Sequence, residues 1–200
     1  MTVKTDNSLM QPTTLRSVGD FTALDSRSAA KLARKAGQRG VELRAQQAGS
    51  TLTVEVIGAP SDVGAAAKKL KGFEANSWTV APDGYDPTGR HTIVVVVSDL
   101  RNLTPRYLAK VGRVAAHRDV DANVDIRPFE GSTTTYGHVE LTGELSDLAK
   151  ALKALSPRNP YKKVAEVRTI TPAPRAEVAA IVPKEAAAPV RAVNYEGEAI

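Results

Sequence analysis

The chain contains the same succession of patterns twice, and this duplication limits the folds that it can adopt. Residues 25–72 read as a helix, two strands and a second helix, and residues 104–156 repeat that order. In each copy an apolar spacing of three to four residues gives way to alternation and then returns, as a helix, a β-hairpin and another helix require. A further strand precedes and follows each copy. We therefore expect two similar units, each of strand, helix, strand, strand, helix, strand.

Composition divides the chain into five segments. Residues 1–14 are polar and without period, which is typical of an arm, and residues 15–81 form the first unit. Residues 82–90 are dense in turn-forming types and are predicted to be the linker, and residues 91–170 form the second unit. Residues 171–200 are rich in Ala, Pro and Val and carry no sustained period, so an extended tail is expected there.

Helix signals in the first unit are local and specific. Asp25 or Ser26 offers a side-chain oxygen that can cap a helix, and Gly37 and Gly40 are expected to end that helix. Pro60 is expected to begin the second helix, because the first turn does not use the N–H that proline lacks. The stretch between these helices alternates apolar and polar residues, which predicts a hairpin with one polar face.

The second unit repeats these signals with different residues. Thr104 and Pro105 are expected to begin its first helix, with Leu108, Val111 and Ala115 facing inward at helical spacing. Its second helix carries a leucine stripe, and the prolines that follow end it. The segment 161–170 is predicted to be the last strand of the sheet.

The run from Ile93 to Val97 leaves neither side of a strand polar, which is typical of a strand covered on both faces. The order of elements resembles the split βαβ pattern of ferredoxin-like domains, written twice. That resemblance implies an α+β fold in which the first and third strands of each unit are central and both helices lie on one face. The other face of the sheet then starts open.

An open apolar sheet face needs a cover, and we expect protein to supply it. The candidate interface residues on this strand are Val94 and Val96, and Ile93, Val95 and Val97 are the alternative face. The cover can be the other unit, a second copy of the chain or a partner protein.

Composition excludes several functions. The chain contains no cysteine, so disulfides, thiolate metal sites and thiol catalysis are excluded. Neither a signal peptide nor an apolar run of membrane length is found, so we expect a soluble protein made in the cytoplasm, without a membrane partner.

The net charge of +5 suggests a polyanionic partner, but it is spread evenly along the chain. Residues 1–84 contain 11 Lys and Arg against 8 Asp and Glu, residues 85–170 contain 13 against 10, and residues 171–200 contain 3 against 4. Dedicated polyanion binders usually concentrate their basic residues on one face or in one arm. This distribution is weak evidence for nucleic-acid binding.

Signatures of enzymes are absent from the sequence. No phosphate-binding loop, nucleophile elbow, zinc helix or dinucleotide fingerprint occurs, so no catalytic residue and no cofactor are predicted. His91, His117 and His138 fall in separate elements and are read as structural. Asp119, Asp121 and Asp125 lack the glycine and the final glutamate of a calcium loop, so no metal site is predicted either.

Nucleic-acid binding remains the alternative function. The topology resembles that of RNA-recognition domains, which stack bases on aromatic side chains of the central strands. Here the third strand of the second unit offers Tyr136 and His138, with Arg127 on the neighbouring strand. Basic side chains recur at helical intervals and are the other candidates: Lys31, Arg34, Lys35, Arg39, Arg106, Lys110 and Arg113.

Small-ligand regulatory domains share the same topology and bind an amino acid at a glycine-rich loop after the first strand. The loops that follow the first strands here carry no such glycines, so this function is not favoured.

The positive features favour a non-enzymatic structural or assembly protein, with other protein subunits as partners, homo-oligomeric or in a larger assembly. A component of the capsid or tail of a bacterial virus is the concrete hypothesis. In the tail, the apolar residues expected to anchor on a neighbour are Val178, Ile181, Val182, Val190, Val193, Tyr195 and Ile200.

Overall fold

The computed structural model describes residues 11–86, 89–128, 133–156 and 165–174. The first repeat consists of β1 (Thr13–Asp20), the 3-10 turn η2 (Phe21–Ala23), α1 (Ser26–Arg39), β2 (Glu42–Ala48), β3 (Thr51–Gly58), α2 (Pro60–Ala67) and β4 (Phe73–Val80). The second consists of β5 (His91–Val97), η3 (Leu100–Asn102), α3 (Pro105–His117), β6 (Asp121–Pro128), β7 (Thr135–Gly143), α4 (Leu145–Leu155) and β8 (Ala165–Pro172).

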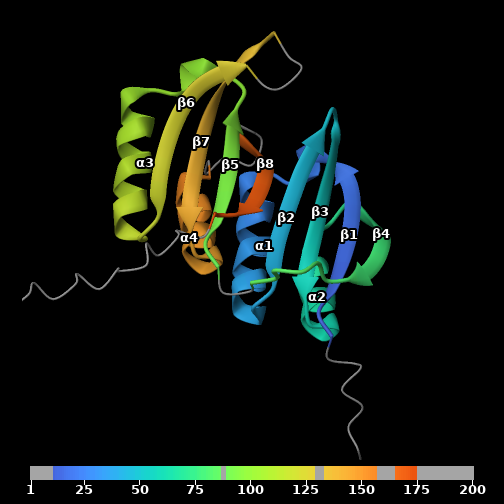
Figure 1. The fold of residues 1–200 in the computed structure, drawn as a ribbon. Coiled ribbons are helices and arrows are strands. Elements are labelled where there is room, and N and C mark those ends of the chain that lie inside the picture. The colour runs from blue at the N-terminus through green and yellow to red at the C-terminus, as the bar shows by residue number, and fades with distance from the viewer. Residues whose placement is uncertain (1–10, 87–88, 129–132, 157–164, 175–200) are drawn as a thin grey trace, which may run out of the picture.

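The strands form one antiparallel sheet of eight, in the order β4-β1-β3-β2-β8-β5-β7-β6 (Figure 1). Within each repeat the first and third strands are central, as the ferredoxin-like pattern predicts. The repeats join where β2 pairs with β8, with Ala45 opposite Ile170. The fold is therefore α+β, with two βαββαβ units sharing one sheet.

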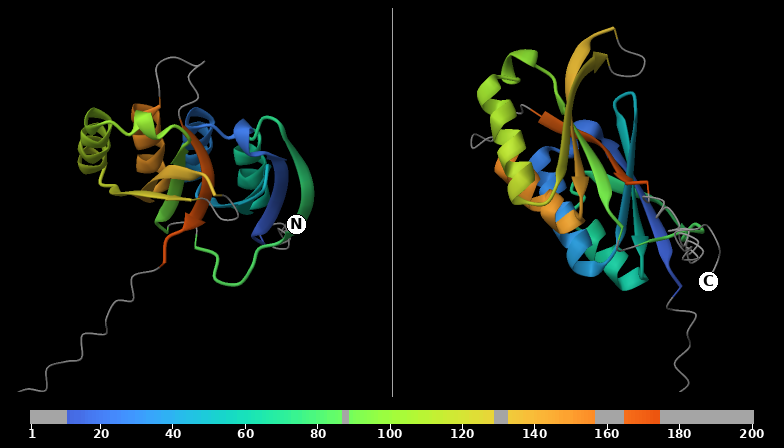
Figure 2. Two further views of the ribbon diagram at one scale, coloured as in Figure 1. Left: turned by 90° about the horizontal axis from the view of Figure 1, so that it is seen from above. Right: turned by 60° about the vertical axis from the view of Figure 1, so that its left-hand side comes forward.

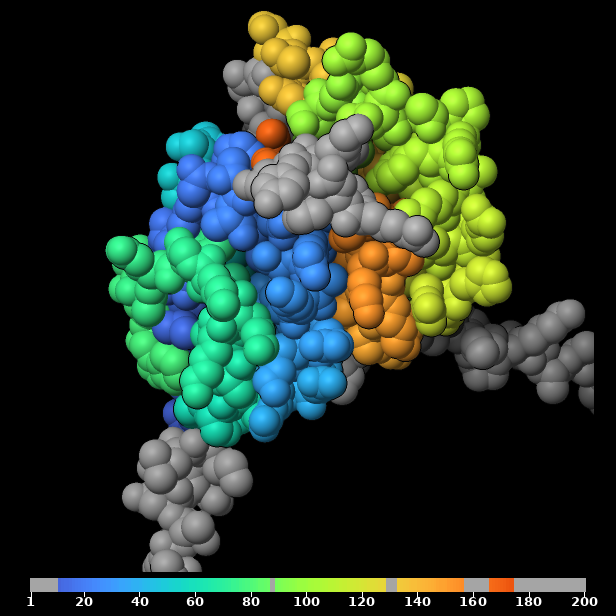
Figure 3. All heavy atoms as spheres, turned by 180° about the vertical axis from the view of Figure 1, so that it is seen from behind, coloured from blue at the N-terminus to red at the C-terminus, as the bar shows by residue number. Residues whose placement is uncertain are grey.

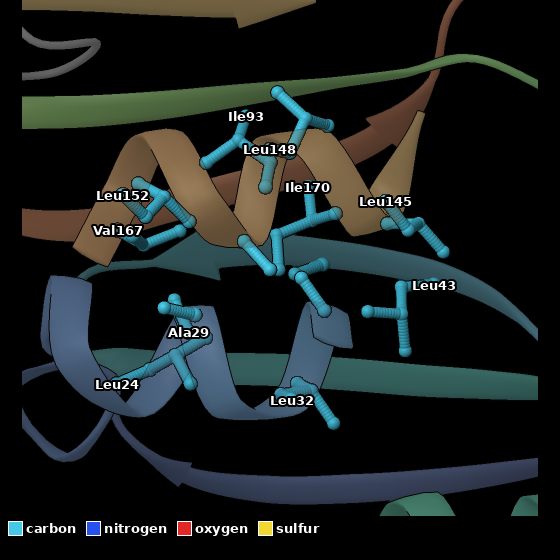
Figure 4. Close-up of a cluster of buried hydrophobic side chains, with 14 of the residues drawn as sticks. Leu24, Ala29, Leu32, Leu43, Ile93, Leu145, Leu148, Leu152, Val167 and Ile170 are labelled. Carbon is cyan, nitrogen blue, oxygen red and sulfur yellow. The ribbon is translucent and has the colours of Figure 1, made fainter. Parts of the chain in front are cut away.

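All four helices lie on one face of this sheet, side by side in the order α2, α1, α4 and α3 (Figure 2). The close packing of α1 on α4 brings the two repeats together. The buried apolar side chains form one continuous cluster drawn from both repeats. Figure 4 shows its centre, where α1 and α4 meet above the sheet, with Leu24, Ala29, Leu32, Leu148, Leu152, Val167 and Ile170.

Local signals set the ends of α1. The Asp25 side chain caps the helix by accepting a hydrogen bond from the Ser28 backbone N–H at 2.7 Å. Gly40 ends it with a left-handed backbone, at φ 61°. The prediction that Gly37 also ends this helix is wrong: Gly37 lies inside α1. A Cβ at this position would come within 3.2 Å of the Ser146 backbone nitrogen in α4, so its small size serves helix packing instead.

Other sequence predictions change at the edges of the molecule. Leu108 was expected to face inward and is instead 39% exposed, because α3 is the outermost helix and has a neighbour on one side only. Val111 and Ala115 are buried as expected. Residues 161–164, predicted to begin the last strand, lie outside the described residues, and β8 continues to Pro172.

The linker supplies part of the cover for the other sheet face. It crosses in front of β2 and β3 (Figure 1). The Tyr85 hydroxyl donates to the Gly40 carbonyl at 3.0 Å, and the Asp86 backbone N–H donates to the Glu42 carboxylate at 3.4 Å. Glu42 is consequently 1% exposed and pairs with Arg44 at 2.7 Å. No helix among the described residues is long and apolar enough to cross a membrane.

Candidate anion-binding surface

Charge is divided between the two faces of the molecule, although it is even along the sequence. The helices contain two acidic residues, Asp62 and Asp147, and ten basic ones: Arg27, Lys31, Arg34, Lys35, Arg39, Arg106, Lys110, Arg113, Lys150 and Lys153. The strands contain four Arg, at 16, 44, 127 and 168, and eight acidic residues: Asp20, Glu42, Glu55, Glu74, Asp121, Asp125, Glu140 and Glu166. Since the apolar core fills the inner side of the strands, their charges point away from the helices.

Most of the helix charges have no carboxylate partner. Within the described part of the chain, Arg39 pairs with Asp62 at 3.2 Å and Lys150 pairs with Asp147 at 2.6 Å, and the other eight basic helix residues form no ion pair. The face of the molecule made by α2, α1, α4 and α3, seen in Figure 3, is thus a basic surface. A large single-sign surface attracts polyanions and raises their association rate.

An open groove of about 540 Å³ lies on this surface between α3 and α4. Val114 and Ala154 are its uncharged lining residues, and the others carry basic side chains: Arg106, Lys110, Arg113, His117 and Arg118. Four of these stand at positions i, i+4, i+7 and i+11 of α3, which is one stripe along the helix. The groove therefore presents a line of basic groups beside an apolar floor.

Local sequence explains why this stripe is straight and exposed. The Thr104 hydroxyl accepts from the Tyr107 backbone N–H at 3.2 Å and fixes the start of α3, with Pro105 in its first turn. Val111 and Ala115 bury the opposite side of the helix. Tyr107 is half-buried, and burial raises the pKa of its phenol.

Sequence reasoning found only part of this site. It identified Arg106, Lys110 and Arg113, and it missed His117 and Arg118 as members of the same groove. The signal for His117 was present, because it continues the stripe by one more helical turn. On α1, Lys31 and Arg34 are exposed as the sequence suggested, and Lys35 is half-exposed.

The second group of predicted nucleic-acid residues lies on the opposite face. Arg127 is paired with Glu140 at 2.5 Å and with Asp125 at 3.6 Å, so its charge is already compensated. His138 is 3% exposed, and the Tyr136 ring packs against the Arg168 guanidinium, whose carbon lies 5.1 Å from the ring centroid. The basic helices and the open sheet face of the second repeat, both predicted for nucleic-acid binding, thus lie on opposite sides of the sheet, and binding through Arg127, Tyr136 and His138 stays a prediction.

The residues of β5 that were predicted to form a protein interface also lie on two different faces of the sheet. Ile93, Val95 and Val97 face the helices and belong to the core. Val94 and Val96 point to the other face, where Val94 is half-buried and Val96 is 2% exposed within the single chain. An interface through Val94 and Val96 stays a prediction, with little of Val96 left for a partner. The predicted tail anchors, from Val178 to Ile200, lie outside the described residues.

The histidines do not form a catalytic or metal-binding cluster. His91 begins β5, His117 ends α3 and His138 lies in β7. Burial lowers the pKa of His91, partly opposed by the Glu42 carboxylate, and burial together with the Arg127 charge lowers the pKa of His138. Among the described residues, no three His, Asp or Glu side chains gather where they could hold a metal ion.

Comparisons with known proteins do not assign this chain to a family. No family model matches the sequence, and no curated protein matches it. Three similar solved structures are a protein from Galdieria sulphuraria (14% identity, TM-score 0.28, covering 82% of this chain and 99% of that one), a microcompartment protein from Desulfitobacterium hafniense (14%, 0.28, 82% and 96%) and the regulatory subunit of aspartate kinase from Thermus flavus (17%, 0.25, 73% and 91%). At these TM-scores none of them supports a function for this chain.

Proposed function

We propose that this chain is a non-enzymatic nucleic-acid-binding protein that holds the phosphate backbone against its helix layer. The observation that carries the proposal is the basic stripe of α3, which lines a groove and forms no ion pair among the described residues. The helices of this face contain ten basic residues and two acidic ones. Phosphate contacts by Lys and Arg supply most of the affinity of sequence-independent binding, through release of counterions.

The shape of the stripe favours a linear polyanion over a compact phosphate ligand. Arg106 and His117 are eleven residues apart, which corresponds to about 16 Å along the helix axis. A single small anion would contact one or two of these side chains and leave the rest unpaired, whereas a nucleic-acid strand offers a phosphate at each step. The adjoining charges of α4 and α1, including Lys153 and Lys31, extend the same surface.

The lining of the groove also bears on specificity. Its residues include no Phe, Tyr or Trp, and His117 is the one lining side chain with a ring on which a base could stack. Phosphate contacts fix position without reading sequence. We therefore expect weak dependence on base sequence and a dissociation constant of about 1–100 μM at physiological salt.

Fluorescence anisotropy with a labelled single strand and a labelled duplex of mixed sequence tests this proposal. The variant Arg106→Glu, Lys110→Glu, Arg113→Glu is expected to abolish binding to both probes. A matched control, Arg16→Glu, Arg90→Glu, Arg101→Glu, changes the net charge equally outside α1, α2, α3 and α4 and is expected to keep most of the binding. Equal losses in the two variants would mean that only net charge matters, and no binding by the unmodified chain would end the proposal.

A second candidate, an assembly protein, is favoured by apolar side chains at the two outer strands of the sheet. Trp78 is 49% exposed and Val80 is 70% exposed on β4, and Ile126 is 57% exposed on β6. Uncovered strands of this kind are templates for pairing with another chain. The more specific role in a virus particle stays a prediction, and no feature of the described residues favours it.

A further inference from the structure

The two repeats correspond residue by residue in their central strands. Leu15 of β1 lies opposite Trp78 of β4, and Ile93 of β5 lies opposite Ile170 of β8. The strand register shifts after Arg16 in β1 and after Val94 in β5, which are the next residues along each central strand. The extra residue in the resulting bulge is Asn76 in β4 and Arg168 in β8. A bulge at the same place in both repeats makes Trp78 the equivalent of Ile170.

The same correspondence holds for the other strand of the junction. Leu15 pairs with Val56 and Ile93 pairs with Leu141, so β3 and β7 align. Two residues earlier on those strands, Val54 pairs with Ala45 of β2 and Val139 pairs with Val124 of β6. Val124 is therefore the equivalent of Ala45.

Inside the chain these equivalent positions meet and are buried. Ala45 lies opposite Ile170 where β2 joins β8, and they are 4% and 0% exposed. At the outer strands, Trp78 is 49% exposed and Val124 is half-buried. The outer strand β4 is thus equivalent to β8, and the outer strand β6 is equivalent to β2. Each lies at one end of the sheet, with no further strand beside it among the described residues.

We propose that β4 of one copy pairs antiparallel with β6 of a second copy, and so repeats the β2–β8 junction between molecules. In this register Trp78 lies opposite Val124 of the second copy, on the helix side of both sheets. The internal junction is paired at Ala45 and Ile170. Continuing the intermolecular ladder past the bulge at Asn76 would bring Ala75 opposite Ile126, whose 57% exposed side chain is also on the helix side. The apolar side chains left exposed at the two outer strands cover one another.

Charge is compatible with this register. Glu74 is the one charged residue of β4, and continuing the ladder past the bulge would bring it near Arg127 of the second copy. Arg127 also pairs with Glu140 and Asp125 of its own chain. Opposite charges across neighbouring strands stabilise a pair and like charges destabilise it. Pairing of β6 with another β6 would leave the exposed Trp78 and Val80 of β4 uncovered. Pairing of β4 with another β4 would leave Ile126 uncovered.

The interface is heterologous, because each copy contributes a different strand to each contact. Such contacts close into a ring or continue as a filament. The helices of successive copies then lie on the same side of one extended sheet, with α2 of one copy next to α3 of the other. This inference stands on the strand equivalence and does not depend on nucleic-acid binding.

Light scattering after size exclusion, with two variants that each block one strand, tests the pairing. The unmodified chain is expected to exceed its 21.2 kDa monomer mass as concentration rises. Trp78→Asp blocks β4 and Ile126→Asp blocks β6, so each variant alone is expected to be monomeric. Mixed in equal amounts they retain one complementary pair of strands, and a species of twice the monomer mass is expected.

Each other outcome overturns the proposal. If the unmodified chain is monomeric, the β4–β6 pairing is excluded. If the Ile126→Asp variant alone still dimerises, the pairing is also excluded, and pairing of β4 with β4 is indicated instead. If Trp78→Asp fails to fold by circular dichroism, Val80→Asp replaces it, because Val80 is 70% exposed on the same strand. This variant is expected to be monomeric alone and to form a species of twice the monomer mass with Ile126→Asp. Association of Val80→Asp with itself would exclude the pairing.

Discussion

Gly37 of α1 lies directly against the backbone of Ser146 at the start of α4, so near that a Cβ on Gly37 would be 3.2 Å from the Ser146 nitrogen. The two repeats are joined in the sheet by β2 and β8 and in the helix layer by this contact. A glycine within a helix is usually destabilising, by roughly 0.5–1 kcal/mol relative to alanine. At position 37 the close approach of α1 and α4 explains why a glycine is present.

Replacing Gly37 by leucine is expected to destabilise the protein by about 1–3 kcal/mol, because the added atoms must separate α1 from α4. Gly112 of α3 provides the control, since nothing lies within 4 Å of a Cβ at that position. Gly112→Ala is expected to stabilise the fold by about 0.5–1 kcal/mol through helix propensity alone. Urea unfolding of the two variants measures both effects.

An opposite result would change the account of the repeat junction. If Gly37→Leu unfolded at the same urea concentration as the unmodified chain, α1 and α4 would not be in contact as described. If Gly112→Ala were destabilising, an interaction other than helix propensity would be present at α3.

The salt dependence of binding is expected to count the phosphate contacts made by α3. The logarithm of the binding constant falls with the logarithm of salt concentration by about 0.7–0.9 for each phosphate neutralised. Replacing Arg106, Lys110 and Arg113 by alanine is therefore expected to reduce the slope by about 2 to 3. The anisotropy titration is repeated at several salt concentrations. An unchanged slope would place the phosphate contacts on other residues, such as those of α1.

Much of the fold could be predicted from sequence because its signals are local or periodic. The apolar run from Ile93 to Val97 indicated a central strand, and β5 is central. Asp25, Gly40 and Pro60 marked helix ends that the structure confirms. Such signals act within one turn or one strand, so they need no knowledge of what packs against them.

Predictions that depended on distant neighbours were less accurate. Gly37 was read as a helix end, since the sequence does not reveal that another helix passes close to it. Leu108 has an apolar spacing but no neighbour, because α3 is the last helix of the layer. The position of a helix within its layer is a tertiary property.

The candidate site was hidden for a related reason. Counting charge along the chain averages helices with strands, so the even distribution concealed a basic helix face and an acidic sheet face. The helical spacing of Arg106, Lys110 and Arg113 was visible in the sequence. The ferredoxin-like pattern also predicted that Arg127 and His138 lie on the open sheet face. It did not predict that Arg127 pairs with Glu140 and Asp125 there, because those ion pairs depend on the register of β6 and β7.

Stability is expected to fall as pH decreases below about 6.5, the ordinary pKa of histidine. Burial lowers the pKa of His91 in the folded chain, so the unfolded chain binds a proton first. The stabilisation by neutral His91 is complete above the pKa that this histidine has in the unfolded chain. It is lost as the pH falls toward the lower pKa that His91 has in the folded chain. His91→Gln cannot titrate, and its melting temperature is expected to change less between about pH 7.5 and 5.5. Equal pH dependence in both proteins would assign the effect to other groups, with His138 the next to replace.

A cation–π contact of Arg168 joins the two repeats. The Arg168 guanidinium carbon lies 4.9 Å from the ring centroid of Phe21, in the first repeat, and 5.1 Å from that of Tyr136, in the second. Arg168 is 9% exposed, so the contact is largely screened from water. Such contacts contribute about 0.5–2 kcal/mol, depending on desolvation.

A double-mutant cycle separates this interaction from simple loss of volume. Arg168→Met keeps much of the aliphatic stem and removes the planar charge, and Phe21→Leu removes the ring while keeping an apolar side chain. Each change is expected to destabilise the protein, and the two together by less than their sum, with a coupling of about 0.5–1 kcal/mol. Arg168→Lys is expected to recover only part of the loss, since an ammonium does not stack on a ring as a guanidinium does. Additive effects in the cycle would mean that Arg168 stabilises the fold through its other contacts and not through the Phe21 ring.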